Sequence, residues 1–190
     1  MYYAAVWLQR VQAQLGAALE VNWRYFSLEQ VNSTEGPEWK LWEQPPEYQS
    51  RGRLAFHAAE AARQQGKVAF ERFNMALLKA RHEQAKKIFL RETVLEAARE
   101  AGLDLARFEA DLANPALLAK LGEDHTYAVE KYGVFGTPTL VFANGRAAYL
   151  KMKPAAPPEE SLTVWNDLAQ TIAHRPYIEE VKRPVPPPGV

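Results

Sequence analysis

Apolar residues near the N-terminus recur at the spacing of one helical face. Val6, Trp7, Val11 and Leu15 follow Tyr3 at steps that bring them to the same side of an α-helix. Gly16 weakens the end of this pattern, because glycine is a poor helix former. The spacing therefore predicts a helix over residues 2–18.

The next segment changes from a helical to an alternating pattern. Between Leu19 and Phe26, large apolar side chains alternate with polar ones, and β-branched and aromatic residues occupy apolar positions. Successive side chains of a strand point to opposite faces of a sheet, so this alternation is typical of a half-buried strand. We therefore expect a strand over this segment.

Residues 29–53 combine turn-forming residues with three large aromatic side chains. Asparagine, serine, glycine and proline gather in this stretch, which predicts a long loop. Trp39, Trp42 and Tyr48 lie in it. These side chains either line a ligand groove or hold the loop on the body of the protein. The length of the loop favours anchoring.

From residue 54 to residue 132 the chain consists almost entirely of strong helix formers. No proline interrupts the pattern before Pro115. Asn114 is a good helix N-cap, and Pro115 suits the first helical position, where its missing N–H costs nothing. We expect helices near residues 53–65, 67–80, 84–101, 104–112 and 115–132.

After Gly133 the pattern changes again. Thr139–Ala143 is a short apolar run that ends at Asn144–Gly145, the two-residue sequence most typical of a β-hairpin turn. Residues 146–152 then form the returning strand. The periodic apolar residues of Glu159–His174 predict a final amphipathic helix.

The order helix, strand, helical block, hairpin and helix predicts an α/β fold. We assign residues 1–28 and 133–176 to one small α/β unit, and residues 50–132 to an all-helical insertion between its halves. Residues 177–190 form a proline-rich tail, expected to be extended and polyproline-like. The sheet should contain the segments near residues 20–26, 139–143 and 147–152.

Composition and charge exclude several functional classes. The 190 residues include 23 Lys and Arg against 23 Asp and Glu, so no net charge favours binding to nucleic acid. No apolar run reaches the roughly 18 residues that a membrane span needs. The first residues also lack the basic and apolar regions of a secretory signal. We expect a cytoplasmic protein that binds neither nucleic acid nor a membrane.

Candidate metal and nucleophile sites are few. The chain contains no cysteine, which excludes a disulfide framework, a thiolate zinc site and a cysteine nucleophile. His82 lacks the second histidine that a zincin helix requires. Glu123, Asp124 and His125 could bind a metal, but an exposed polar helix face is favoured. The basic stretch over residues 79–91 is also interpreted as a solvated face. We therefore expect no metal site.

The most informative motif is Val134–Phe142. In it Gly136, Thr137 and Pro138 form a tight turn directly before a strand. Proline cannot donate to a sheet ladder, so it belongs at the start of the strand, and it is a candidate for a cis peptide bond. The backbone N–H and C=O of Thr137 would then face outward, free to pair with an extended peptide or a thiol.

This motif and its context resemble the DsbA-like thioredoxin family, including its cytoplasmic FrnE-type and chromene-carboxylate isomerase relatives. The similarity extends over Glu20–Leu28, Ser50–Glu83, Ala101–Asp104 and Tyr132–Leu150. It implies a thioredoxin-like fold and an oxidoreductase function of the thiol–disulfide type.

The same resemblance places Gly136, Thr137 and Pro138 in the family's cis-proline loop, as a binding site. It also implies that Pro138 borders the main groove. The groove is then lined in part by Tyr2 and Tyr3, at the N-terminal end of the first helix.

The chain departs from the family at its start. The family's reactive Cys-x-x-Cys, or its one-cysteine or serine variant, lies at the start of the first long helix and follows a first strand. This chain begins inside that helix. The resemblance therefore implies that the N-terminal strand and the reactive turn are missing from the chain as given. We expect a segment encoded upstream, or another group, to fill the place of that central strand.

Three functional hypotheses remain open. The first is an oxidoreductase whose catalytic segment lies outside this chain. The second is a redox-silent member that binds a ligand or a peptide. The third is a relative of the glutathione-dependent isomerases. Glutathione or a similar small thiol, or an extended peptide, is the expected ligand. The pattern identifies no catalytic residue, substrate or oligomeric state.

Overall fold

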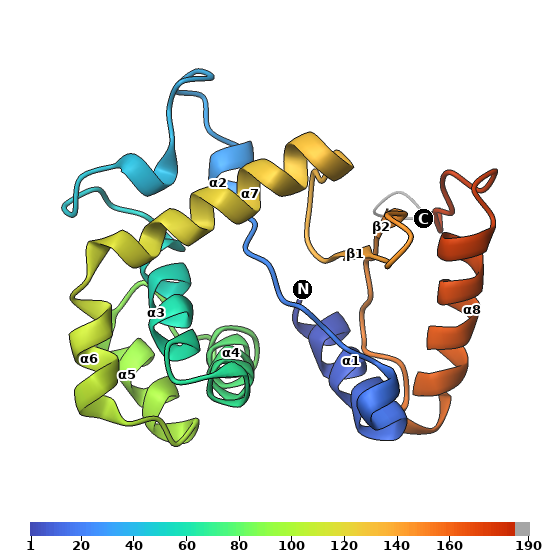
Figure 1. Ribbon diagram of the computed structural model, residues 1–190, viewed down its shortest axis with the longest axis horizontal. Coiled ribbons are helices and arrows are strands. Elements are labelled where there is room, and N and C mark those ends of the chain that lie inside the picture. Colours follow the sequence, from blue (N-terminus) through green and yellow to red (C-terminus); the bar gives the residue numbers. More distant parts are fainter. Residues whose placement is uncertain (185–190) are drawn as a thin grey trace, which may run out of the picture.

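The computed structural model describes residues 1–184, and Figure 1 shows two groups of elements joined by extended segments. One group consists of α1 (Tyr2–Leu15), β1 (Thr139–Val141), β2 (Ala147–Tyr149) and α8 (Ser161–His174). The other group is helical and is called the helical block. It contains α2 (Leu28–Val31), α3 (Arg53–Arg63), α4 (Lys67–His82), α5 (Arg91–Glu100), α6 (Leu105–Leu112) and α7 (Ala119–Tyr132). Short 3-10 turns are η1 (Gly16–Ala18), η2 (Leu41–Glu43), η3 (Pro115–Leu118) and η4 (Pro158–Glu160).

Helix α1 packs against α8 through its apolar face. Trp7 and Val11 are fully buried there. The rings of Trp7 and Trp165 lie 6.0 Å apart, and the Trp7 indole Nε1 donates a hydrogen bond of 3.0 Å to the Ser161 carbonyl oxygen. This bond satisfies the polar atom of a buried indole. The predicted first and last helices are thus confirmed, with α1 ending at Leu15, before Gly16.

The predicted hairpin is confirmed, with shorter strands than expected. β1 and β2 pair antiparallel, with Thr139 opposite Tyr149 and Val141 opposite Ala147. At the turn, Gly145 has φ 81°, and the Arg146 N–H donates to Asn144 Oδ1 at 3.1 Å. Asn-Gly therefore closes the hairpin by local chemistry.

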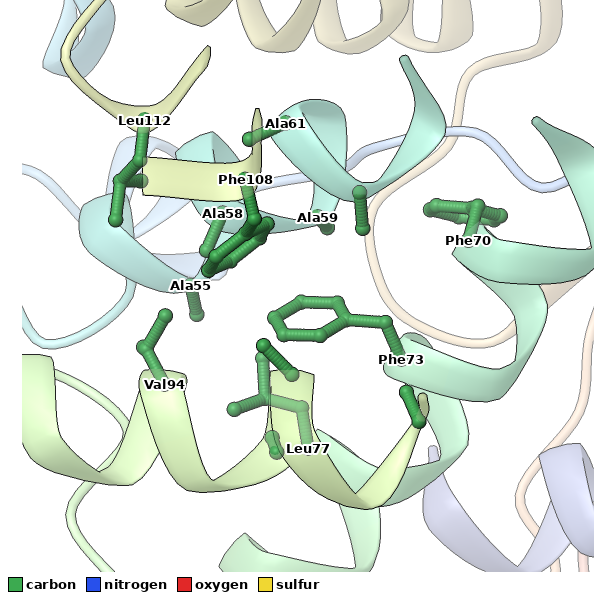
Figure 2. Packing of buried hydrophobic residues seen from close by; sticks show 14 of the residues in the cluster. Ala55, Ala58, Ala59, Ala61, Phe70, Phe73, Leu77, Val94, Phe108 and Leu112 are labelled. Carbon is green, nitrogen blue, oxygen red and sulfur yellow. The ribbon is translucent and has the colours of Figure 1, made fainter. Parts of the chain in front are cut away.

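The helical block has its own hydrophobic core. Phe73 and Phe108 are fully buried, with ring centroids 5.4 Å apart, and alanines of α3 allow close approach of the neighbouring helices (Figure 2). Between residues 54 and 130, all of which the structure describes, there are helices and turns but no strand. Periodicity therefore predicted the character of this region correctly.

One helix boundary in the block was predicted wrongly. The expected helix over residues 84–101 begins only at Arg91, because α4 continues to His82 and ends in a tight turn. In that turn Ala85 has φ 54°, and the Lys86 N–H donates to the Ala80 carbonyl oxygen at 2.9 Å. A residue in the left-handed region stops a helix, and here an alanine takes that role without any glycine to signal it.

Three cations of the basic stretch over residues 79–91 pair with acidic side chains of neighbouring helices. Lys79 lies 3.5 Å from Glu100, and Lys86 lies 2.6 Å from Glu96. Arg91 of α5 likewise contacts Glu109 of α6 at 2.7 Å. These exposed ion pairs fit the interpretation of a solvated charged surface.

The strand predicted over residues 19–26 is not formed. The segment is extended, but the sheet of the described residues contains only β1 and β2. Side chains of other elements form hydrogen bonds with its backbone groups instead. Asp124 accepts from the Tyr25 N–H, His125 accepts from the Ser27 N–H, and Arg63 donates to the Trp23 carbonyl oxygen. The alternating pattern thus indicated extended backbone correctly, but it did not indicate the partner.

The rest of the described chain adds two facts. From the end of α8 to residue 184 there is no helix or strand, and residues 185–190 of the predicted tail lie outside the described residues. Among residues 1–184, no helix combines the length and the apolar character needed to cross a membrane.

Candidate functional site

A cavity of about 770 Å³ lies beside the extended segment, between α3, α4 and the turn at Thr137. Its wall includes residues 23–29, the first part of the following loop, the N-terminal half of α3 and one face of α4. Small-molecule sites in proteins commonly have volumes of roughly 300–1,000 Å³ and mostly apolar walls. The cavity therefore has the size of a binding site for a small organic molecule.

The floor of the cavity is aromatic and apolar. The Tyr25 ring lies 5.9 Å from Phe56 and 6.3 Å from Phe70, both in edge-on geometry. Ala55 and Ala59 of α3 also line the cavity, with small apolar side chains. The floor can accept the flat or extended apolar part of a ligand.

A buried polar network holds the floor in place. The Tyr25 hydroxyl donates to Glu60 Oε2 at 2.9 Å, and the Arg63 Nε donates to the same oxygen at 3.1 Å. The Arg63 guanidinium also lies 3.6 Å from the centre of the Phe70 ring. Burial raises the pKa of the Tyr25 hydroxyl far above its ordinary value, so it stays protonated and donates. The network joins the extended segment to α3 and α4.

Two buried side chains of α7 support the wall of the cavity. Asp124 is 4% exposed; its Oδ2 accepts from the Tyr25 N–H at 3.1 Å and its Oδ1 accepts from Arg24 at 3.0 Å. His125 is 6% exposed, and its Nδ1 accepts from the Ser27 N–H at 3.2 Å. Burial, and secondarily the charge of Lys40, lowers the pKa of His125 and keeps this nitrogen free to accept.

The positions of Asp124 and His125 correct the sequence-based expectation of an exposed polar helix face. Both are buried and bound to the backbone of the extended segment. Within residues 1–184, no group of three or more histidine or acidic side chains is placed to hold a metal ion. Charged neighbours on a helix usually indicate solvent contact, and nothing local in this sequence signals the opposite.

The aromatic residues of the loop over residues 29–53 divide between the two roles considered from the sequence. Trp42 anchors the loop on α7, where a Cβ atom at Gly122 would lie 2.6 Å from its Nε1 atom. Trp39 and Tyr48 line the cavity, with ring centroids 5.8 Å apart. The Gln30 side chain fixes this arrangement, because it donates to the Trp39 carbonyl oxygen and accepts from the Leu41 N–H, each at 2.8 Å.

The turn before β1 meets the cavity at one residue. Thr137 lines the cavity, whereas Gly136 and Pro138 are buried beside it and do not. The Thr137–Pro138 peptide bond is cis, and the Pro138 carbonyl oxygen accepts from the Leu150 N–H at 2.9 Å. A Cβ atom at Gly136 would lie 3.1 Å from the Tyr149 ring, so the turn packs tightly on β2. The N–H and C=O of Thr137 have no backbone partner among residues 1–184.

Tyr2 and Tyr3, expected from the resemblance to line the groove, are not among the lining residues. Tyr2 instead stacks on His82, which lines the cavity, with ring centroids 5.6 Å apart, and its hydroxyl donates to Glu83. Burial, followed by the Glu83 hydrogen bond, raises the pKa of Tyr2 to about 12. Tyr3 is 38% exposed. Tyr2 therefore supports a lining residue without reaching the cavity.

Comparison with known proteins agrees with the family expected from the sequence. The chain matches the family described as "DSBA-like thioredoxin domain" over residues 2–163. It is also similar to the uncharacterized protein Rv2286c of Mycobacterium tuberculosis, with 28% identity over 192 residues. That alignment covers 100% of this chain and 79% of the relative. The match to the family extends over most of the chain, and the chain therefore belongs to the DSBA-like thioredoxin domain family.

Proposed function

We propose that this chain is a ligand-binding member of the DSBA-like family, and that it holds a small organic molecule in the cavity beside Thr137. The observation that carries the proposal is the cavity itself, whose volume of about 770 Å³ suits a drug-sized ligand. An apolar floor supplies binding energy, and the free backbone groups of Thr137 supply a polar contact at the edge.

The redox chemistry of the family cannot come from the side chains of this chain. Thiol–disulfide exchange requires a thiolate that attacks a disulfide, and the sequence contains no cysteine. We expect an insulin-reduction assay on this chain to stay at background. Turnover clearly above background would contradict the proposal that the chain acts only by binding.

A second candidate follows from the position of Thr137. A thiol ligand such as glutathione, bound with its backbone-like amides against Thr137, would bring the sulfur atom that the chain lacks. Edge pairing of an extended ligand with a free backbone is a recurrent binding mode. This candidate corresponds to the glutathione-dependent relatives of the family, and an extended peptide would use the same contacts.

Filling the cavity tests the proposed function. Ala55 lines the cavity, so Ala55→Leu should reduce its volume, whereas Ala106→Leu makes the same change on the exposed face of α6. Reduced glutathione, S-hexylglutathione and dodecan-1-ol are the probes, and the readout is the shift of the melting temperature, because ligands that bind the native state raise it. We expect at least one probe to stabilise the unmodified chain and Ala106→Leu but not Ala55→Leu. Equal shifts in all three proteins, or no shift in any, would contradict the proposal.

A further inference from the structure

The cavity carries positive charge that the protein itself does not neutralise. Three arginines line it, and one of them, Arg24, is paired with Asp124 at 3.0 Å. Arg51 and Arg81 have neither an ion pair nor a side-chain hydrogen bond among residues 1–184. Both are exposed, so each guanidinium is available to a ligand that enters from solvent.

The acidic residues of the lining do not fully compensate its cationic groups. Glu29 accepts a hydrogen bond of 2.7 Å at its Oε2 atom from the neutral Ser50 hydroxyl, and it forms no ion pair among residues 1–184. Glu35 is exposed and lies in the loop over residues 29–53. With Arg24 paired, three cationic groups of the lining without an ion pair among residues 1–184, which are Arg51, Arg81 and the amino group of Met1, therefore face the two carboxylates of Glu29 and Glu35.

Charge and apolar surface are separated within the cavity. Arg51 lies two residues before the start of α3 and Arg81 lies in the last turn of α4, so both are at the helix ends remote from the turn that joins the two helices. Ala59 and Phe70, which are nearer that turn, are 5% and 1% exposed. The two helices thus carry cationic lining only at their free ends, whereas apolar lining extends along both of them from the shared turn to Phe56 and Leu78.

This separation identifies the chemical class of the ligand. We propose that the cavity binds an amphipathic organic anion, whose apolar body lies against the aromatic floor and whose anionic group pairs with Arg51 and Arg81. The inference rests on the proposed function and adds the ligand class. Burial of the apolar body is favourable in proportion to its area. A guanidinium recognises a carboxylate or a similar oxyanion through paired N–H donors.

Three probes with the same alkyl chain separate charge from apolar burial. They are dodecanoate, dodecan-1-ol and dodecyltrimethylammonium, each titrated below its micelle concentration. Trp23 and Trp39 line the cavity, so their fluorescence reports occupancy, and calorimetry gives the affinity independently. We expect dodecanoate to bind about tenfold more tightly than dodecan-1-ol, the ratio that about 1.4 kcal/mol of differential interaction produces. The cationic probe should bind most weakly.

Variants of the two arginines then test whether these residues cause the preference for dodecanoate. Arg51→Gln and Arg81→Gln replace the charged guanidinium group by a shorter, neutral and still polar side chain. The double variant should lose the preference for dodecanoate while it still binds dodecan-1-ol. Arg99→Gln, an exposed position on α5 outside the cavity, should keep the preference. Circular dichroism checks that each variant remains folded.

The outcomes distinguish this inference from the proposed function. Equal affinity for dodecanoate and dodecan-1-ol, or a preference that survives in the double variant, would overturn the anion inference and leave ligand binding intact. Binding of none of the three probes would also overturn it, and the comparison of Ala55→Leu with Ala106→Leu would then decide the proposed function separately.

Discussion

The hairpin and the extended segment before α2 were both expected as strands, and they are held in different ways. In the hairpin, β1 pairs with β2 only a few residues away, and Asn144–Gly145 supplies the turn. In the extended segment, Tyr25 and Ser27 donate to Asp124 and His125, about a hundred residues further along the chain. An extended backbone can thus be supported by a neighbouring backbone or by buried side chains of a helix.

The two kinds of support have different weaknesses. The bonds of a hairpin join backbone groups to backbone groups, so the loss of one side chain removes none of them. The extended segment depends on single carboxylate and imidazole acceptors, and their loss leaves buried N–H groups without partners. Because this segment forms a wall of the cavity, damage to its support should also reach the binding site.

The largest effect is expected from Asp124→Ala. The substitution leaves the Tyr25 N–H unpaired and removes the partner of Arg24, so the free energy of unfolding should fall by about 3 kcal/mol. Urea unfolding measures it. Asp167→Ala on the exposed face of α8 is the matched control and should change stability by less than about 0.5 kcal/mol. Hydrogen exchange should show faster exchange at Tyr25, with the Leu150 amide of the hairpin unaffected. An equal increase of the exchange rate at both amides would refute the distinction between the two kinds of support.

His125→Leu should have a smaller effect. It removes the acceptor of the Ser27 N–H but keeps an apolar side chain against Phe26, whose ring lies 4.6 Å from the imidazole. We expect a loss of about 2 kcal/mol in urea unfolding. His174→Leu, at the exposed end of α8, should leave stability nearly unchanged. A stable His125→Leu with an unchanged Ser27 exchange rate would show that the hydrogen bond contributes nothing.

Mild acid should weaken the extended segment. Burial, and then Lys40, lowers the folded-state pKa of His125 below its unfolded value of about 6.5, so the unfolded chain takes up the proton first. The contribution of His125 is therefore complete above about pH 6.5 and decreases as the pH falls through the folded-state pKa. The loss is at most about 1.4 kcal/mol per pH unit.

Mild acid should also reduce the contribution of His82 to stability, because burial, the N-terminal amino group and Arg81 lower the pKa of His82 as well. The free energy of unfolding is measured from pH 7.5 to 5.0 in the unmodified chain, in His82→Gln and in His125→Leu. This comparison separates the contributions of the two histidines. The pH slope should be shallower in His125→Leu than in the unmodified chain. An identical slope would assign the pH dependence to other groups.

The smallest effect is expected in the hairpin. Gly145 has φ 81°, and a Cβ atom there would meet nothing within 4 Å, so Gly145→Ala should cost only the backbone preference, about 1 kcal/mol. Gly145→Asn should recover part of this loss, since asparagine tolerates the left-handed region. Thermal unfolding measures both variants. A larger loss for Asn than for Ala would contradict the backbone explanation.

Much of the fold follows from local sequence. The helices and the hairpin turn were predictable, because periodicity, helix propensity and Asn-Gly turn chemistry act over a few residues. The family was expected from the resemblance of the motif around Pro138 and its context. The glycine and proline that flank Thr137 also predicted the turn before β1, where Thr137 lines the cavity. Local signals did not indicate that Tyr2 would stack on His82 while remaining outside the cavity. Nor did they show that Ala85 would end α4, since an alanine carries no stop signal.

By itself, the sequence determined the alternation of Leu19–Phe26, the helical character of residues 54–132 and the absence of a thiol. Tertiary structure decided that the alternating segment pairs with Asp124 and His125, and that α3, α4 and Thr137 enclose a cavity with two unpaired arginines at its edge. The physical reason is distance along the chain. A backbone N–H requires some partner wherever it is buried, but its own neighbours do not specify which residue, a hundred positions away, will supply the acceptor.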